Sequence, residues 1–291
     1  MQDERSATGT LSVRDTGKRT ERRVAFADGT RICPLGQGTW QMGRRRDEEI
    51  CALRRGIDLG LTLIDTAEMY GTEDLVGEAV RGCRDRAFIV SKVLPGNASY
   101  EGTKRACEQS LRRLGTDYID LYLLHWKGRY PLSETVRALA ALKQEGKILR
   151  WGMSNLDVAD MEHILSLPCG EECAADQVLY NLENRGVEYD LIPWGEQHNM
   201  PVMAYTPLGE GRLRNHRTLT AIARRHGATP TQVVLAWTIR TANVIAIPKA
   251  GSIAHAEENV RSLDIDLTEE ELKEIDEAFP APTRKIPLAG W

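Results

Sequence analysis

Eight short apolar segments recur along the chain, and each is separated from the next by a segment with helical spacing of apolar residues. Most are apolar throughout, which is typical of parallel strands buried on both faces. Eight such units in 291 residues predict a closed (β/α)8 TIM barrel. A doubly wound open sheet is the alternative. It favours a GxGxxG turn after its first strand, and the nearest match, GQGTWQMG, lacks that spacing.

The expected elements follow from these periodicities and from glycines at helix ends. Strands are expected near residues 36–40, 61–65, 87–92, 118–125, 148–155, 174–178, 201–207 and 244–249. Helices are expected over 47–60, 73–82, 99–114, 133–145, 157–166 and 188–198, twice within 217–241, and as extra C-terminal helices at 254–260 and 268–279. An Asp-Gly turn at residues 28–29 between two short β-like runs predicts an N-terminal hairpin.

Composition limits the classes of partner. Residues 1–22 are polar and charged, which predicts a disordered or loosely docked extension before a single barrel domain over 23–291. The formal net charge of −4 argues against nucleic acid or an anionic membrane as the main partner. No signal-peptide centre is evident, and no apolar run approaches the ~20 residues of a membrane span. Six scattered cysteines without a CxxC pattern predict reduced thiols in a cytoplasmic protein with no metal site. We expect a monomer or weak oligomer.

Polar side chains stand at the carboxyl ends of the expected strands. In a barrel these ends meet at one rim, where the chemistry of such folds is located. The residues at the strand ends, with Tyr70 on the loop after the second strand, are Asp65, Tyr70, Lys92, His125, Ser154, Asn155, Gln177, Tyr205, Thr206 and Lys249.

Four of these residue types together suit the protonation of an alkoxide. A buried Lys92 beside a buried Asp65 can stay charged. An ammonium near the phenol of Tyr70 is expected to lower its pKa from the reference value of ~10 and so make it a general acid. A neutral His125 can orient a carbonyl oxygen. A lyase or isomerase that uses Lys92 as a Schiff base is a more distant alternative.

Several motifs together resemble the aldo-keto reductase superfamily: DTAEMYG, SKV, LLHW, GMSN, AYTPLG and IPKAGSIAHAEEN. The resemblance spans roughly residues 24–280, and LIDTAEMY and DLYLLHW are most similar to bacterial reductases of methylglyoxal and other small aldehydes. It implies the barrel fold, hydride transfer from NADPH to a carbonyl without a metal, and a catalytic tetrad. The tetrad residues are Asp65, Tyr70, Lys92 and His125.

The resemblance also implies a cofactor site. Ser154, Asn155 and Gln177 would hold the nicotinamide carboxamide, and Tyr205 would stack on the ring. The pyrophosphate would lie along Pro207, Leu208 and Gly209, and the adenosine end would contact Lys249, Ser252, His255, Glu258 and Asn259. His255 stands where the family commonly has arginine and lacks the bidentate fork of that residue. We therefore expect a weakened preference for NADPH, with some use of NADH.

The substrate pocket is expected around Trp40, Met69 and Trp126, although each could instead pack in the core. The short loop after the seventh strand favours small aldehydes and ketones. Trp291 could fold over the pocket mouth or belong to a free tail. A different class of function stays open: a barrel that binds the cofactor as a redox sensor or regulator with little turnover.

Overall fold

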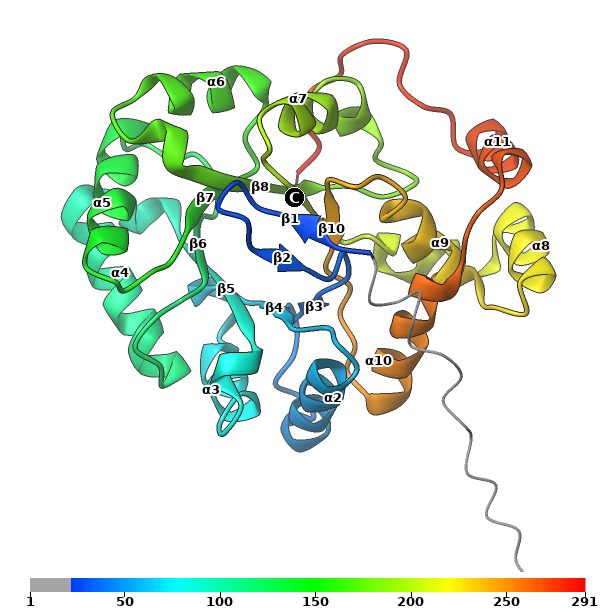
Figure 1. Cartoon of the computed structure of the whole chain (residues 1–291), viewed down its shortest axis with the longest axis horizontal. Coiled ribbons are helices and arrows are strands. Elements are labelled where there is room, and N and C mark those ends of the chain that lie inside the picture. Colours follow the sequence, from blue (N-terminus) through cyan, green and yellow to red (C-terminus); the bar gives the residue numbers. More distant parts are fainter. Residues whose placement is uncertain (1–21, 291) are drawn as a thin grey trace, which may run out of the picture.

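The computed structural model describes residues 22–290. Figure 1 shows a ring of helices around a parallel sheet of eight strands, in which each strand pairs with its neighbours in chain order from β3 to β10. Residues 1–21 and Trp291 lie outside the described part of the chain, so the expectations for the N-terminal extension and for Trp291 stay predictions. Arg22, the last residue of the expected extension, forms an ion pair with Asp266.

The sheet closes on itself. The backbone N–H of Gly36 donates to Ala246 O at 2.8 Å, and the N–H of Ala246 donates to Pro34 O at 2.8 Å. These bonds join the chain just before β3 to β10, the last strand. The predicted (β/α)8 barrel is therefore confirmed, and the open sheet is excluded.

The barrel strands lie within the expected segments or reach one residue beyond them. They are β3 (Gln37–Gly38), β4 (Leu63–Asp65), β5 (Phe88–Val93), β6 (Leu121–Leu124), β7 (Trp151–Ser154), β8 (Cys173–Leu179), β9 (Val202–Tyr205) and β10 (Val244–Ala246). The α-helices are α2 (Arg46–Asp58), α3 (Glu73–Ala79), α4 (Tyr100–Leu114), α5 (Leu132–Gln144), α6 (Val158–Ser166), α7 (Leu191–Gln197), α8 (Arg217–Arg225), α9 (Pro230–Thr238), α10 (Ile253–Val260) and α11 (Glu269–Ala278). Short 3-10 helices complete the connections: η1 (Glu68–Tyr70), η2 (Arg84–Arg86), η3 (Pro95–Asn97), η4 (Gly170–Glu172), η5 (Gly186–Glu188), η6 (Gly209–Asn215) and η7 (Arg261–Asp264).

The predicted hairpin is present and closes the amino-terminal end of the barrel. Strands β1 (Val24–Ala25) and β2 (Arg31–Ile32) pair antiparallel around the turn. Phe26 stacks on Phe88, the first residue of β5, with ring centroids 5.5 Å apart. Because the hairpin fills this end with apolar side chains, the opposite end is left for polar groups.

The alternation of side chains along each strand determines which residues face the interior of the barrel. Phe88 and Val90 of β5 belong to the apolar cluster inside the barrel, so the period of two residues also turns Lys92 inward. On β4, Leu63 belongs to the same inner cluster, so Asp65, two residues later, also faces inward. Leu123 of β6 belongs to it too, and His125 follows two residues later at the end of that strand. These polar residues thus lie above the apolar layers, at the carboxyl ends of the strands.

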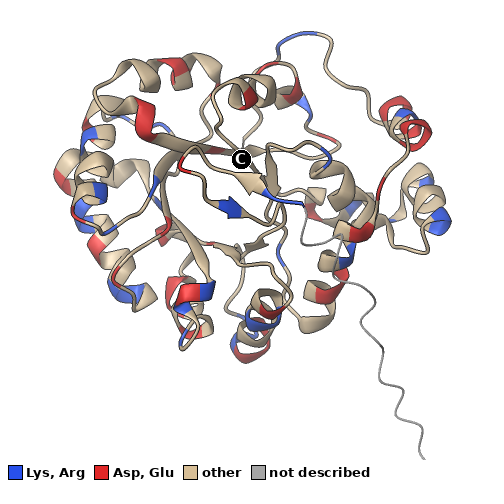
Figure 2. Cartoon of the chain, in the orientation of Figure 1, with Lys and Arg blue, Asp and Glu red and all other residues tan. Residues whose placement is uncertain are grey.

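Helix α4 is capped at both ends by residues of its own sequence. The side chain of Ser99 accepts a hydrogen bond from Gly102 N at 3.2 Å at the start of α4, and Gly115 ends it with a left-handed φ of 63°. Charged residues lie mainly on the outer helices and loops, as Figure 2 shows. No helix in the described residues is long and apolar enough to cross a membrane.

Candidate active site

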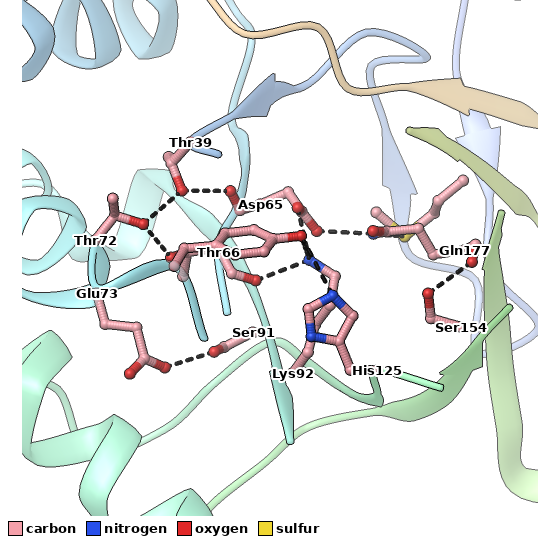
Figure 3. A network of polar contacts seen from close by, with 12 residues as sticks. Thr39, Asp65, Thr66, Thr72, Glu73, Ser91, Lys92, His125, Ser154 and Gln177 are labelled. Atoms are coloured by element: carbon pink, nitrogen blue, oxygen red, sulfur yellow. Dashed lines mark hydrogen bonds and ion pairs between the residues drawn. The ribbon is translucent and has the colours of Figure 1, made fainter. Parts of the chain in front are cut away.

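A buried ion pair joins the ends of β4 and β5 (Figure 3). Lys92 Nζ lies 2.7 Å from Asp65 Oδ1 and donates to Thr66 O at 2.9 Å. The side chain of Lys92 is 0% exposed. Burial lowers the pKa of Lys92, but Asp65 and Tyr70 outweigh it, and the net pKa lies above the ordinary value. Lys92 is therefore an ammonium at neutral pH.

Tyr70 reaches this ion pair from η1. Its phenol oxygen is 3.3 Å from Lys92 Nζ. Glu68, at the start of η1, fixes the loop because its carboxylate accepts from Leu94 N at 2.5 Å. Gly71 then ends η1 in the left-handed conformation with φ 65°, which glycine adopts without steric cost. The loop thus holds the phenol over the end of β5.

The pKa of Tyr70 differs from the expectation. Burial raises it, the charge of Lys92 lowers it, Asp65 raises it again, and the net pKa lies above the usual value of 10. The predicted lowering of the Tyr70 pKa is therefore wrong, because burial outweighs the attraction to Lys92. The consequence is a phenol that keeps its proton throughout the neutral range.

His125 completes the group from the end of β6. Its Nε2 is 3.5 Å from the Tyr70 oxygen. Burial, followed by the charge of Lys92, lowers the pKa of His125 to about 3, so the imidazole is neutral at physiological pH. Its Nδ1 is buried without a hydrogen-bond partner among residues 22–290. The structure thus brings together the four residues expected to form the tetrad.

Gln177 of β8 binds the same carboxylate from across the barrel. Its Nε2 donates to Asp65 Oδ2 at 2.7 Å, while no described residue donates to its Oε1. Ser154 of β7 donates its hydroxyl to Gln177 O at 2.7 Å. Gln177, one of the residues expected to hold a carboxamide, therefore contacts the ion pair itself, and Ser154 bonds the backbone of Gln177.

Asn155 follows Ser154 in the left-handed conformation, with φ 61°. Its Nδ2 donates to His125 O at 3.0 Å and to Ser154 Oγ at 3.1 Å. Its Oδ1 accepts from the Tyr205 hydroxyl at 2.8 Å. Both amide hydrogens of Asn155 are thus used, while its carbonyl oxygen keeps acceptor capacity.

The rim near Ser154, Asn155 and Gln177 offers hydrogen-bond acceptors to a ligand. The donors of Ser154, Asn155 and Gln177 are directed at other protein groups. Lone pairs remain on Ser154 Oγ, Asn155 Oδ1 and Gln177 Oε1. Such a set suits a ligand that presents N–H donors, and the amino group of a carboxamide is one.

Three threonines behind the ion pair were missed by sequence reasoning. Thr39 donates to Asp65 O at 2.9 Å, and its hydroxyl lies 2.9 Å from that of Thr72. Thr66 extends the chain of hydroxyls, 2.9 Å from Thr72. Thr66 directly follows Asp65 and Thr72 directly follows Gly71, so their nearness to the motif was a usable signal, whereas Thr39 carried none.

The expected pocket residues lie at the mouth of the site and are exposed. Trp40 is 49% exposed, Met69 41% and Trp126 37%. The ring of Trp40 lies 4.9 Å from that of Tyr70, and Trp126 lies 4.8 Å from His125. None of the three belongs to the buried core, so core packing does not explain them. The two indoles therefore place apolar surface beside the phenol and the imidazole.

A separate cavity of about 290 Å³ lies at the expected adenosine end. Its lining includes five residues expected at the cofactor site: Leu208, Lys249, His255, Glu258 and Asn259. Ser252 is not in the lining but caps α10, since its Oγ accepts from His255 N at 3.3 Å. Pro207 and Gly209 are buried beside Leu208 and are not part of the lining. Sequence reasoning missed Arg214 and residues 229–231, which also line it.

The described residues hold neither a metal-binding cluster nor a disulfide. Over residues 22–290, no group of three or more His, Cys, Asp or Glu side chains could hold a metal ion. All six cysteines, which belong to this range, are free of disulfides.

Fold and site together define a barrel with a cluster of ionisable side chains at its carboxyl rim, where the active sites of barrel enzymes lie. The sequence profile of the Aldo/keto reductase family matches residues 34–279. The chain therefore belongs to the aldo/keto reductase family and is an oxidoreductase. The expected resemblance is confirmed.

Characterised relatives cover nearly the whole chain. The chain is 51% identical over 279 residues to methylglyoxal reductase YeaE of Escherichia coli K12, covering 92% of this chain and 98% of that protein. It is 35% identical to a 9,11-endoperoxide prostaglandin H2 reductase of Trypanosoma cruzi, over 87% of this chain and 90% of that protein. A glyoxal reductase of Bacillus subtilis is 32% identical, over 87% and 91%.

Solved structures agree with the fold. A Klebsiella pneumoniae aldo/keto reductase in complex with NADP and acetate matches with a TM-score of 0.90 and 51% identity, covering 92% of this chain and 99% of that one. An aldo-keto reductase of the same organism in complex with NADPH matches with a TM-score of 0.90 and 50% identity, covering 93% and 99%.

Proposed function

We propose that this protein reduces small aldehydes and ketones to alcohols with NADPH, and that Tyr70 is the general acid. One observation carries the proposal: the phenol oxygen of Tyr70 lies between the Lys92 ammonium, at 3.3 Å, and the His125 imidazole, at 3.5 Å. A carbonyl oxygen bound at this point meets a proton donor on one side and a neutral ring on the other. As the oxygen becomes an alkoxide, it takes the phenol proton.

Lys92 and Asp65 support the proton transfer without making it. Once the phenol gives up its proton, the ammonium stabilises the phenolate at short range. Asp65 keeps Lys92 charged inside the barrel, and Gln177 holds the second oxygen of that carboxylate. The raised pKa of Tyr70 means that the phenol donates only when a stronger base, the alkoxide, is present.

NADPH is the cofactor that fits the remaining residues. It supplies the hydride when bound. Ser154, Asn155 and Gln177 offer the acceptors that suit its carboxamide, and Tyr205 stands beside them, since its hydroxyl bonds Asn155. Pro207, Leu208 and Gly209 follow directly and would lie along the pyrophosphate. The cavity around Lys249, with His255, Glu258, Asn259 and the Ser252 cap, would take the adenosine end.

The substrate is proposed to be a small dicarbonyl or aldehyde such as methylglyoxal. The E. coli relative is a methylglyoxal reductase, and the B. subtilis relative is a glyoxal reductase. Trp40 and Trp126 stand close to the reacting group, which favours a compact substrate. The proposed site uses residues of one chain, so the proposal needs no second copy.

Two other functions make different predictions. A redox-sensing barrel would bind NADPH with little turnover, whereas a Schiff-base enzyme would need an uncharged Lys92. The ion pair with Asp65 and the raised pKa of Lys92 disfavour that amine as a nucleophile. Borohydride in the presence of a carbonyl substrate would trap Lys92 covalently only in the Schiff-base enzyme.

Turnover tests the proposal directly. NADPH oxidation is followed spectrophotometrically with methylglyoxal, and binding is followed by quenching of tryptophan fluorescence. Binding with steady turnover is expected. Tight binding without turnover on a panel of aldehydes and ketones would favour the sensor, and failure of NADPH and NADH to bind would overturn the proposal.

A further inference from the structure

We propose that Arg214 supplies the guanidinium that recognises the 2′-phosphate of NADPH, in place of the arginine that His255 does not provide. The inference rests on the proposed use of NADPH. Arg214 belongs to η6, the loop after β9, and is 35 residues from Lys249 in the chain. Both nevertheless line the same cavity, together with His255 of α10.

The loop turns back on itself to bring Arg214 there. Glu210 and Gly211 are both left-handed, with φ 56° and 83°. An added Cβ at Gly211 would lie 3.3 Å from Arg214 Nε, so the guanidinium packs against the bare backbone of this glycine. A polar loop without periodicity thus places a cation at the mouth of a cavity built by other elements.

The charges around the cavity point to an anion. In the described part of the chain, the side chains of Arg214 and Lys249 have no hydrogen bond or ion pair, whereas Arg212 of the same loop is paired with Glu183 and Glu210. The one carboxylate in the lining, Glu258, accepts from Thr229 Oγ1 at 2.7 Å. Two cations therefore face one carboxylate, and the lining is net positive only while Arg214 is present.

Arginine and lysine contribute differently to such a site. The planar fork of Arg214 can bind two oxygens of a phosphomonoester, while Lys249 acts as a point charge. NADH carries a hydroxyl where NADPH carries the phosphate, so it lacks the phosphate contacts with Arg214 and Lys249. Arg214 thus restores the NADPH selectivity that His255 alone would weaken.

Arg212 is a matched control in the same loop. It pairs with Glu183 at 3.1 Å and with Glu210 at 3.2 Å, and it does not line the cavity. Removing either arginine changes the net charge of the protein equally. A general effect of charge on an anionic cofactor would therefore appear in both variants, and a local contact in only one.

The test compares Arg214→Gln, Arg214→Lys and Arg212→Gln. Dissociation constants for NADPH and NADH are measured by fluorescence quenching, and adenosine 2′,5′-bisphosphate is compared with adenosine 5′-monophosphate as a competitor. Arg214→Gln is expected to weaken NADPH and the bisphosphate by about tenfold or more and NADH by less than about twofold. Arg214→Lys should fall between wild type and Arg214→Gln, and Arg212→Gln should match wild type.

A second variant separates the local contact from loop damage. Adding His255→Arg to Arg214→Gln places a guanidinium on another residue of the cavity lining and should recover much of the NADPH affinity. Equal weakening of NADPH and NADH by Arg214→Gln, or equal loss in Arg212→Gln, would overturn the role of Arg214 while leaving the reductase proposal intact. Wild-type protein that binds neither dinucleotide would instead overturn both.

Discussion

Gln177 donates its side-chain amide to Asp65 Oδ2, at 2.7 Å, the carboxylate oxygen that Lys92 does not bind. The two residues are 112 positions apart and stand on β8 and β4, so the bond crosses the barrel. It gives both oxygens of a buried carboxylate a partner. The group proposed to hold the cofactor and the group proposed to tune the acid therefore share one carboxylate.

Removing this bond should destabilise the barrel in a way that depends on the replacement. Gln177→Leu leaves Asp65 Oδ2 buried without that partner and is expected to lower the free energy of unfolding by about 1–3 kcal/mol. Gln177→Glu adds a second carboxyl, which can donate to Asp65 when protonated but repels it when ionised. Its loss of stability should therefore be larger at pH 8 than at pH 5. Urea denaturation at both pH values checks this, and a pH-independent loss in Gln177→Glu would contradict it.

Tyr70→Phe should abolish reduction while NADPH affinity stays close to that of wild type. The phenol acts as the carbonyl oxygen becomes an alkoxide, so kcat and kcat/KM should fall together by about 10²–10⁴-fold. The raised pKa of Tyr70 also predicts that wild-type activity is not lost through deprotonation of this phenol below pH 10, its ordinary pKa. Steady-state kinetics on methylglyoxal decide. A variant that keeps more than about a tenth of wild-type kcat would remove Tyr70 from the acid role.

Lys92→Met should remove both activity and stability. The phenolate would lose its nearby cation, and Asp65 would be left as a buried charge without its partner, which typically costs about 3–5 kcal/mol. Adding Asp65→Asn to Lys92→Met removes that charge and should recover much of the stability but none of the activity. Denaturation curves and kinetics of the single and double variants separate the two effects. Recovered turnover in the double variant would exclude the proposed role of the ammonium.

His125 should make the protein sensitive to acid. Its pKa in the folded protein, about 3, lies below the ordinary value of 6.5, so folding favours the neutral ring. The associated stability is complete above pH 6.5 and is lost as the pH falls toward 3, with a slope of up to about 1.4 kcal/mol per pH unit. His125→Gln should have a shallower decline between pH 6.5 and 4 than wild type. Equal slopes in urea denaturation would show that His125 does not bury a neutral ring.

Much of the site could be foreseen because parallel strands bring their carboxyl ends to one rim. The apolar runs before Asp65, Lys92 and His125 indicated strands. Because side chains alternate along a strand, the local sequence also indicates which of them face the barrel interior. Trp40 and Trp126 were expected near the carbonyl, and both lie against members of the expected tetrad. These features depend on neighbours a few positions away, which the sequence lists directly.

The pKa of Tyr70 could not be foreseen in the same way. The expected strand ends place the Lys92 ammonium near Tyr70, which lowers the pKa, but burial has the larger effect and the net pKa of Tyr70 is raised. Burial is contributed by Trp40, His125 and other residues distant in the chain. The sequence therefore led to the proposal of Tyr70 as the acid, but the direction predicted for its pKa was wrong.

Fold class, strand order and the rim residues are properties of local periodicity, and the amino-acid sequence alone specified them here. The partnership of Gln177 with Asp65 and the arrival of Arg214 beside Lys249 depended on closure of the barrel. Hydrogen bonds, burial and charge balance act over a few ångströms of space, whatever the separation along the chain. Residues 112 or 35 positions apart therefore acquire these properties only once the chain has folded.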